Sequence, residues 1–187
     1  MRPRPPAKPP VFRLPTATVY SCGYRHLGLD WSTDKDIDEL SQELMSALGK
    51  KLIVVMECLM FHDRPRSCPG VNGEVMHRVA DASDRFTEWM RATKANIMRL
   101  MHLKRVDNPG GVPNLEIVMV CRSGKHRSVA CAELTAFVLE QLGWTVDVEH
   151  IHNFKWGKCK GGCKRCQMCD YLKRDAFKIA LTTWQSV

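Results

Sequence analysis

The chain has 187 residues and a formal net charge of +8, and 44% of its residues are hydrophobic. A chain of this length can bury one sizeable core, so we expect one α/β domain with appendages. No segment approaches the ~20 apolar residues of a membrane-spanning helix, and the N-terminus lacks the apolar stretch of a secretory signal. The positive charge favours an anionic partner and gives no reason to expect a membrane.

Residues 1–15 hold six prolines and four basic residues. Proline lacks a backbone N–H and fixes φ, which excludes a helix interior and a central strand. We therefore expect a disordered, basic tail ahead of the folded domain.

Apolar runs and helical repeats alternate through residues 16–154, which we take as the α/β domain. This alternation predicts a mostly parallel sheet flanked by helices on both faces, with a Cys-rich appendage at residues 155–187. In chain order the expected elements are a strand at 16–22, a helix from residue 32 or 33 to 48, a strand at 51–58, a short helix before residue 81, a longer helix to 106, a strand at 115–121, a helix at 129–142, a strand at 144–150 and a helix at 170–184.

Polar residues follow the strand at 51–58, in the loop that spans residues 60–70. In an open parallel sheet, ligands bind beyond the carboxyl ends of the strands. Asp63 lies in this loop and is the carboxylate that we expect nearest to a ligand at that edge.

The strand at 115–121 ends in Cys121, and a glycine-containing turn leads from it to Arg127, Ser128 and a helix. Such a turn presents backbone N–H groups at the positive end of a helix dipole, which is an anion site. Arg127 adds a bidentate cation and Ser128 adds a hydroxyl.

The spacing Cys-x5-Arg-Ser is also the signature of cysteine-dependent phosphatases. In that reading Cys121 is the nucleophile, Arg127 clamps the phosphate, and Asp63 is placed to act as the general acid. Against it, Lys125, His126 and Arg127 supply more cation than thiolate activation requires, and no clear general-acid signature accompanies them. The sequence therefore favours binding over catalysis.

Nine cysteines occur, and four of them crowd into eleven residues near the C-terminus with the spacing C-x3-C-x2-C-x2-C. An odd count without a secretory signal indicates a reducing compartment, so we expect an intracellular, cytoplasmic protein.

Four thiolates this close can hold one tetrahedral Zn²⁺ ion, although an iron–sulfur cluster or free thiols remain alternatives, and His150 or His152 could replace one thiol. The expected metal ligands are Cys159, Cys163, Cys166 and Cys169.

The segment Cys-Arg-Ser-Gly-Lys-His-Arg-Ser-Val, residues 121–129, resembles C-T-G-G-K-H-R-S-V of the C-terminal domain of the RNase adapter protein RapZ. In the same order, residues 21–28 are similar to its S-F-G-Y-K-Y-G, residues 55–65 to its F-D-V-R-F-L-P-N-P, and His150 to the His of its H-R-D-like element. The resemblance covers residues 16–153 and implies a domain that binds regulatory RNA and senses a phosphorylated amino sugar. Carried over by position, the ligand-binding residues are Cys121, Ser123, Gly124, Lys125, His126, Arg127, Ser128, Gly23, Tyr24, Asp63 and His150.

Three departures separate this sequence from that family. No G-x4-G-K-[ST] motif of its nucleotide-binding domain occurs, Leu59 and Ile151 stand where the family has arginines, and the cysteine cluster replaces the family's usual ending. The expected partner is therefore a phosphate-bearing ligand, which leaves RNA, a nucleotide or a phosphorylated sugar open. The oligomeric state does not follow from the sequence.

Overall fold

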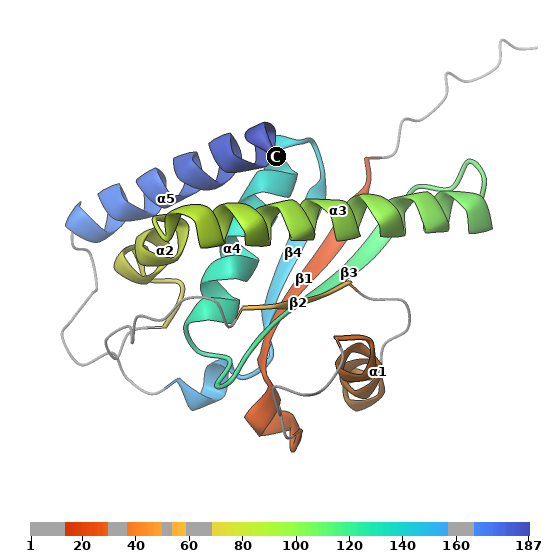
Figure 1. The fold of residues 1–187 in the computed structure, drawn as a ribbon, viewed down its shortest axis with the longest axis horizontal. Helices are drawn as coiled ribbons and strands as arrows, with labels where there is room; N and C mark the ends of the chain where they lie inside the picture. Colours follow the sequence, from red (N-terminus) through yellow and green to blue (C-terminus); the bar gives the residue numbers. More distant parts are fainter. Residues whose placement is uncertain (1–13, 30–36, 50–53, 59–68, 157–166) are drawn as a thin grey trace, which may run out of the picture.

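The computed structural model describes residues 14–29, 37–49, 54–58, 69–156 and 167–187. Its four strands form one parallel sheet in the order β2-β3-β1-β4, which confirms the predicted α/β class (Figure 1). The elements are β1 (Thr16–Gly23), the 3-10 helix η1 (Tyr24–Leu27), α1 (Ile37–Leu48), β2 (Val54–Glu57), α2 (Gly73–Ala80), α3 (Ser83–Asp107), β3 (Asn114–Cys121), α4 (Arg127–Gln141), β4 (Thr145–His150), the 3-10 helix η2 (Asn153–Lys155) and α5 (Gln167–Ser186).

The central strands β1 and β3 pair over their full length, and their last residues, Gly23 and Cys121, are register partners. On the outer side of β1, Ser21 pairs with His150 of β4. On the outer side of β3, Val120 pairs with Glu57 of β2. Because every strand is parallel, all four carboxyl ends meet at one edge of the sheet.

Alternate side chains of β1 and β3 face opposite sides of the sheet, as strand geometry requires. Tyr20, Cys22, Val118 and Val120 form one buried cluster with Leu44 of α1. The other face carries a larger buried core to which α2, α3, α4 and α5 contribute. Figure 1 shows α1 on one side of the sheet and the remaining α-helices on the other, so helices flank both faces as predicted.

Helices α2 and α5 pack against each other, and both contact α4. The N-terminus of α2 is capped by Asn72, whose side chain accepts a hydrogen bond from the N–H of Glu74. A side chain at Gly73 would collide with the Cys169 carbonyl, so glycine permits this close crossing. His77 and Asp175, 2.9 Å apart, tie the two helices further along.

The chain leaves the neighbouring strands β1 and β3 in opposite directions. After β1 it continues to α1 on one face, whereas after β3 it enters α4 on the other face. In open α/β sheets this divergence opens a crevice beyond the strand ends, where ligands bind. The turn that follows Cys121 lies at this switch point.

Several expected features fall outside the described residues: the tail at 1–13, the first residues of the helix before Leu48, the loop that contains Asp63, and residues 157–166 of the Cys-rich appendage. Helix α5 begins at Gln167, three residues before the predicted start. Within the described ranges, no helix is long and apolar enough to cross a membrane.

Candidate functional site

The turn between β3 and α4, residues 122–126, packs directly on the end of β1. Gly124 adopts φ +62°, a left-handed conformation that favours glycine. A Cβ built on Gly23 would lie 2.5 Å from the Gly124 nitrogen, closer than real Cβ atoms approach. Both glycines are therefore needed for the turn to lie against the strand.

Three carbonyls of this turn accept hydrogen bonds from segments outside both the turn and the helix α4 that follows it. The Arg122 carbonyl accepts from the N–H of Arg25 at 3.4 Å, and the Lys125 carbonyl accepts from the N–H of Gly70 at 2.8 Å. The Gly124 carbonyl accepts from the indole N–H of Trp156 at 3.1 Å.

These bonds fix the direction of the neighbouring N–H groups. The described residues contain no cis peptide bond, and in a trans peptide the C=O and the following N–H point to opposite sides. The N–H groups of Ser123, Lys125 and His126 therefore point away from the three outer donors. Backbone N–H groups that converge in a turn can bind an anion, so the anion site that the sequence predicts here stays a prediction.

Cys121 and Ser128 flank the turn, and their side chains contact each other. The Cys121 Sγ lies 3.1 Å from the Ser128 Oγ, and the two residues are 2% and 0% exposed. Ser128 stands in the first turn of α4, immediately after the half-buried Arg127. The sulfur is thus a buried partner of a hydroxyl, at the positive end of a fifteen-residue helix.

Two arginines act electrostatically on residues around the turn. Burial raises the pKa of Tyr24, while the positive charges of Arg122 and Arg127 act to lower it. Burial likewise raises the pKa of Glu57, against the opposing effect of Arg127. The structure thus gathers Tyr24, Arg122 and Arg127 at the carboxyl edge of the sheet, beside Glu57 at the end of β2.

Sequence reasoning missed Glu57 and Arg122, although each is adjacent to a strand end or a predicted site residue. It also missed Trp156, which no local pattern connects to a turn so far away along the chain. The position of Glu57 as the last residue of β2 was the available signal, because the carboxyl ends of parallel strands converge.

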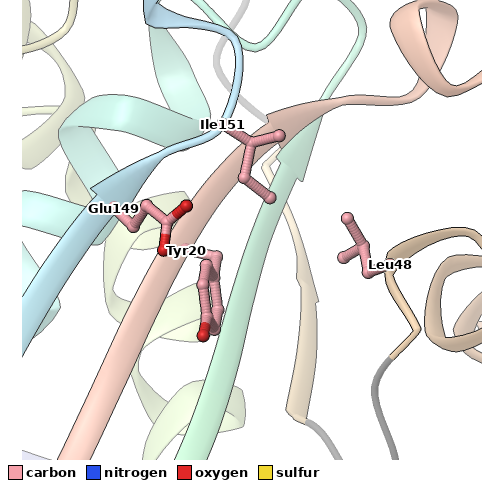
Figure 2. Close-up of a pocket in the computed structure, with 4 residues that line it drawn as sticks. All are labelled: Tyr20, Leu48, Glu149 and Ile151. Atoms are coloured by element: carbon pink, nitrogen blue, oxygen red, sulfur yellow. The ribbon is translucent and has the colours of Figure 1, made fainter.

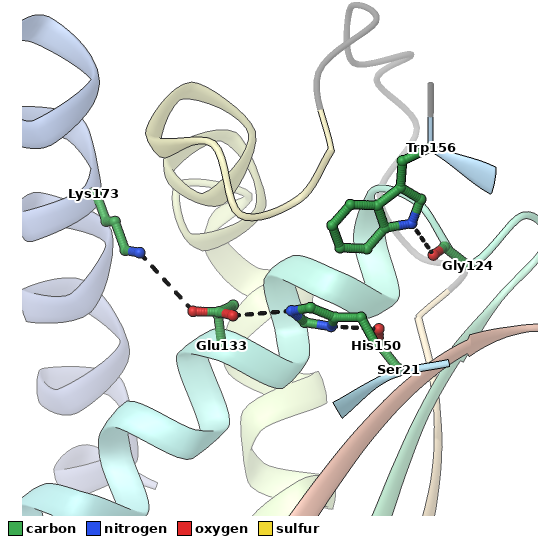
Figure 3. Close-up of polar contacts among 6 residues, drawn as sticks. All are labelled: Ser21, Gly124, Glu133, His150, Trp156 and Lys173. Atoms are coloured by element: carbon green, nitrogen blue, oxygen red, sulfur yellow. Dashed lines mark hydrogen bonds and ion pairs between the residues drawn. The ribbon is translucent and has the colours of Figure 1, made fainter. Parts of the chain in front are cut away.

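The two histidines at the end of β4, His150 within the strand and His152 beyond it, make different contacts. The His152 Nδ1 accepts a hydrogen bond from the Gly23 N–H at 3.1 Å, and its ring lies 4.9 Å from that of His26. The predicted ligand residue His150 instead contacts Ser21 at 2.7 Å and Glu133 at 3.0 Å through its two ring nitrogens (Figure 3).

Two other buried thiols lie near the site. Burial and the neighbouring Cys121 raise the pKa of Cys22 to about 12. Burial and a hydrogen bond with Cys131 raise the pKa of Cys58 above its ordinary value. Because the thiolate is the reactive form, Cys22 and Cys58 are packing residues at neutral pH.

The described ranges contain no group of three or more His, Cys, Asp or Glu side chains that could hold a metal ion. Cys159, Cys163 and Cys166 lie outside those ranges, so the zinc site stays a prediction. Cys169 lies in the first turn of α5, where its Sγ accepts a hydrogen bond from the Asn72 Nδ2 at 3.5 Å. Asp63 also lies outside the described residues.

A separate hollow of about 220 Å³ lies on the α1 side of the sheet. Figure 2 shows that Tyr20 and Glu149 come from adjacent strands, with Leu48 of α1 across from them and Ile151 above. Its lining includes no residue of the turn at 122–126, so the hollow is distinct from the candidate anion site.

Comparison with curated proteins gives no significant match. The family model of the RapZ C-terminal domain matches residues 60–153, half of the 187-residue chain. The matched range contains β3, the turn with its two flanking residues Cys121 and Arg127, and β4. The chain therefore belongs to the RapZ C-terminal domain family.

Proposed function

We propose that the protein is a non-catalytic binding domain whose turn at residues 121–128 holds a phosphate group of its ligand. The observation that carries this proposal is that the Arg122, Gly124 and Lys125 carbonyls accept hydrogen bonds from donors outside the turn. That bonding turns the N–H groups of Ser123, Lys125 and His126 away from the outer donors, where an anion could accept hydrogen bonds from them.

The charge of the surrounding side chains supports the same ligand class. Arg122, Lys125 and Arg127 bring three formal positive charges to the turn and its flanks. Membership of the RapZ family supports a nucleotide or RNA as the partner. The ligand classes are therefore RNA, a nucleotide or a phosphorylated sugar, which share the phosphate that the turn would hold.

The proposal is tested by calorimetric titration of the full chain with inorganic phosphate, comparing wild type with Arg127→Gln. Loss of one charge-assisted contact should weaken binding about tenfold or more, since such hydrogen bonds contribute about 1.5–3 kcal/mol. The matched control is Arg99→Gln, which removes the same charge from an exposed position on α3. Equal weakening by both variants would indicate general electrostatic attraction and would reject a site at the turn.

Salt dependence then separates the ligand classes. A nucleic acid that contacts several phosphates should lose affinity steeply between about 50 and 200 mM salt, with a slope proportional to the number of phosphates neutralised. A nucleotide or sugar phosphate held mainly in the turn should show a shallow slope. A protein that binds none of these ligands at low salt would contradict the proposal.

The contact between Cys121 and Ser128 favours one alternative, a cysteine-dependent phosphatase. A hydroxyl 3.1 Å from the sulfur could stabilise a thiolate that attacks the phosphorus of a phosphate monoester held by Arg127 and displaces its alcohol. The 2% exposure of Cys121 argues against easy attack. Turnover of para-nitrophenyl phosphate that disappears in Cys121→Ser would support the alternative, and absence of turnover would reject it.

A further inference from the structure

Trp156 reaches the turn from the far end of η2. Its indole N–H is the outer donor to the Gly124 carbonyl, and its ring is half-buried. The other two outer donors, the N–H groups of Arg25 and Gly70, belong to the backbone. Of these three bonds to the turn, only that of Trp156 depends on a side chain.

A chain of polar contacts lies behind the indole, as Figure 3 shows. The His150 ring centroid is 5.1 Å from that of Trp156, with the ring planes at 48°. On its other sides, the imidazole contacts the Ser21 Oγ through Nδ1 and the Glu133 Oε1 through Nε2. The second carboxylate oxygen of Glu133 lies 3.9 Å from the Lys173 Nζ. We call Ser21, His150, Glu133 and Lys173 the His150 relay.

The relay fixes both nitrogens of the imidazole. The hydrogen bond from His150 lowers the pKa of Glu133 more than any other contact, so this carboxylate is ionised at neutral pH and can only accept. The Nε2 atom must then carry the proton, and in the neutral ring the Ser21 hydroxyl donates to Nδ1. With side-chain exposures of 13% for His150 and 21% for Glu133, the contact is largely shielded from water, which strengthens it.

We infer that Trp156 is a positioning residue for the anion-binding turn, and that the His150 relay holds its indole in place. Without the indole N–H, the Gly124 carbonyl loses its outer partner, and the peptide between Gly124 and Lys125 can rotate. Rotation would point a carbonyl oxygen, rather than the Lys125 N–H, toward the anion. The inference rests on the proposed function, because it assigns these residues to the same site.

The first test replaces Trp156 with phenylalanine, which retains an aromatic ring and removes the N–H. Phosphate affinity, measured by calorimetry on the full chain, should fall about two- to tenfold, the range expected for one net hydrogen bond. The matched control is Trp144→Phe, which changes another half-buried indole beside β4. Unchanged affinity in Trp156→Phe, or an equal fall in the control, would overturn the inference.

The second test asks whether the relay acts through the indole. Glu133→Gln should weaken phosphate binding, whereas Glu140→Gln, an exposed change on the same helix, should not. In a double-mutant cycle, Glu133→Gln should have little further effect once Trp156 is phenylalanine, because the two residues share one path to the turn. Fully additive effects would show that Glu133 acts independently of Trp156. They would overturn the inference that the His150 relay holds the indole in place.

A third measurement needs no ligand and separates this inference from the proposed function. Hydrogen exchange of the Trp156 indole N–H, followed by NMR, should be at least about twofold faster in Glu133→Gln than in wild type, because a bond held by the relay opens more often. An unchanged exchange rate would overturn the inference that the His150 relay holds the indole, even if the protein binds phosphate. A wild-type protein that does not bind phosphate would overturn the proposed function. The exchange rate would still show whether the His150 relay holds the indole in place.

Discussion

Gly23 and Gly124 lie back to back, and neither position has room for a side chain. A Cβ on Gly23 would lie 2.5 Å from the Gly124 nitrogen, and a Cβ on Gly124 would overlap the Gly23 nitrogen. The end of β1 therefore forms the support on which the turn after β3 rests. The contact also explains why two distant glycines are required for one site.

Gly23→Ala should destabilise the fold and abolish phosphate binding, because the new methyl group displaces the turn. We expect a loss in the free energy of unfolding of about 1–3 kcal/mol, as for other insertions into a packed site. Urea unfolding and phosphate titration measure the two effects.

Gly110→Ala is the control for glycine-specific conformation. Gly110 has φ +85° and no described atom within 4 Å of its would-be Cβ. Its replacement should cost some stability through backbone strain and leave phosphate affinity unchanged. Normal phosphate binding by Gly23→Ala would show that the turn does not depend on this contact.

Cys22 should resist alkylation in the folded protein. Its thiol is fully buried and its pKa is raised to about 12, so almost no thiolate is present at about pH 8. Treatment with iodoacetamide followed by peptide mass spectrometry should leave Cys22 unmodified in native protein and modify it in urea. Rapid modification of native Cys22 would contradict the burial that the structure assigns to it.

Glu133 should contribute stability that depends on pH. The hydrogen bond from His150 lowers its pKa in the folded state below the ordinary 4.5. A lowered folded pKa means that the ionised group stabilises the fold above the unfolded pKa, and that this stability is lost as the pH falls through the folded pKa.

Wild type should therefore exceed Glu133→Gln in the free energy of unfolding by on the order of 1–2 kcal/mol at about pH 7. Denaturant unfolding across a pH series should show this difference shrinking below about pH 4.5. A difference that grows on acidification would have the wrong sign for the proposed cause.

The C-terminal cysteine cluster should hold about one zinc ion per chain, as four close thiolates do in structural zinc sites. Elemental analysis of the purified protein should find this zinc, and Cys163→Ser should lose most of it. Cys131→Ser, a change at a buried cysteine of α4, should retain it. Iron in place of zinc, or no metal at all, would reject the prediction.

The sheet was predictable because its central strands are short runs rich in apolar and β-branched residues. Residues 115–121 form such a run, and the strand at 16–22 precedes a glycine that turns the chain. Alternating strands and helices then predict parallel pairing. The turn after Cys121 was also predictable, because a strand, a glycine-containing turn and a helix follow one another in the sequence.

The histidines show where sequence reasoning stops. His150 and His152 are two residues apart, and a local pattern gives no means to separate their roles. The register that pairs Ser21 with His150 turns the His150 side chain toward α4. His152 lies beyond the strand end and reaches Gly23. Only the tertiary pairing of β1 with β4 distinguishes them.

The central claim is that backbone N–H groups of the turn bind phosphate. It is tested most directly by amide NMR of the full chain during titration with inorganic phosphate. The account predicts saturable shifts of the Ser123, Lys125 and His126 amide signals, with little change at Asn114, at the opposite end of β3. Shifts spread over the exposed basic residues of α3, or no change in the turn, would contradict it.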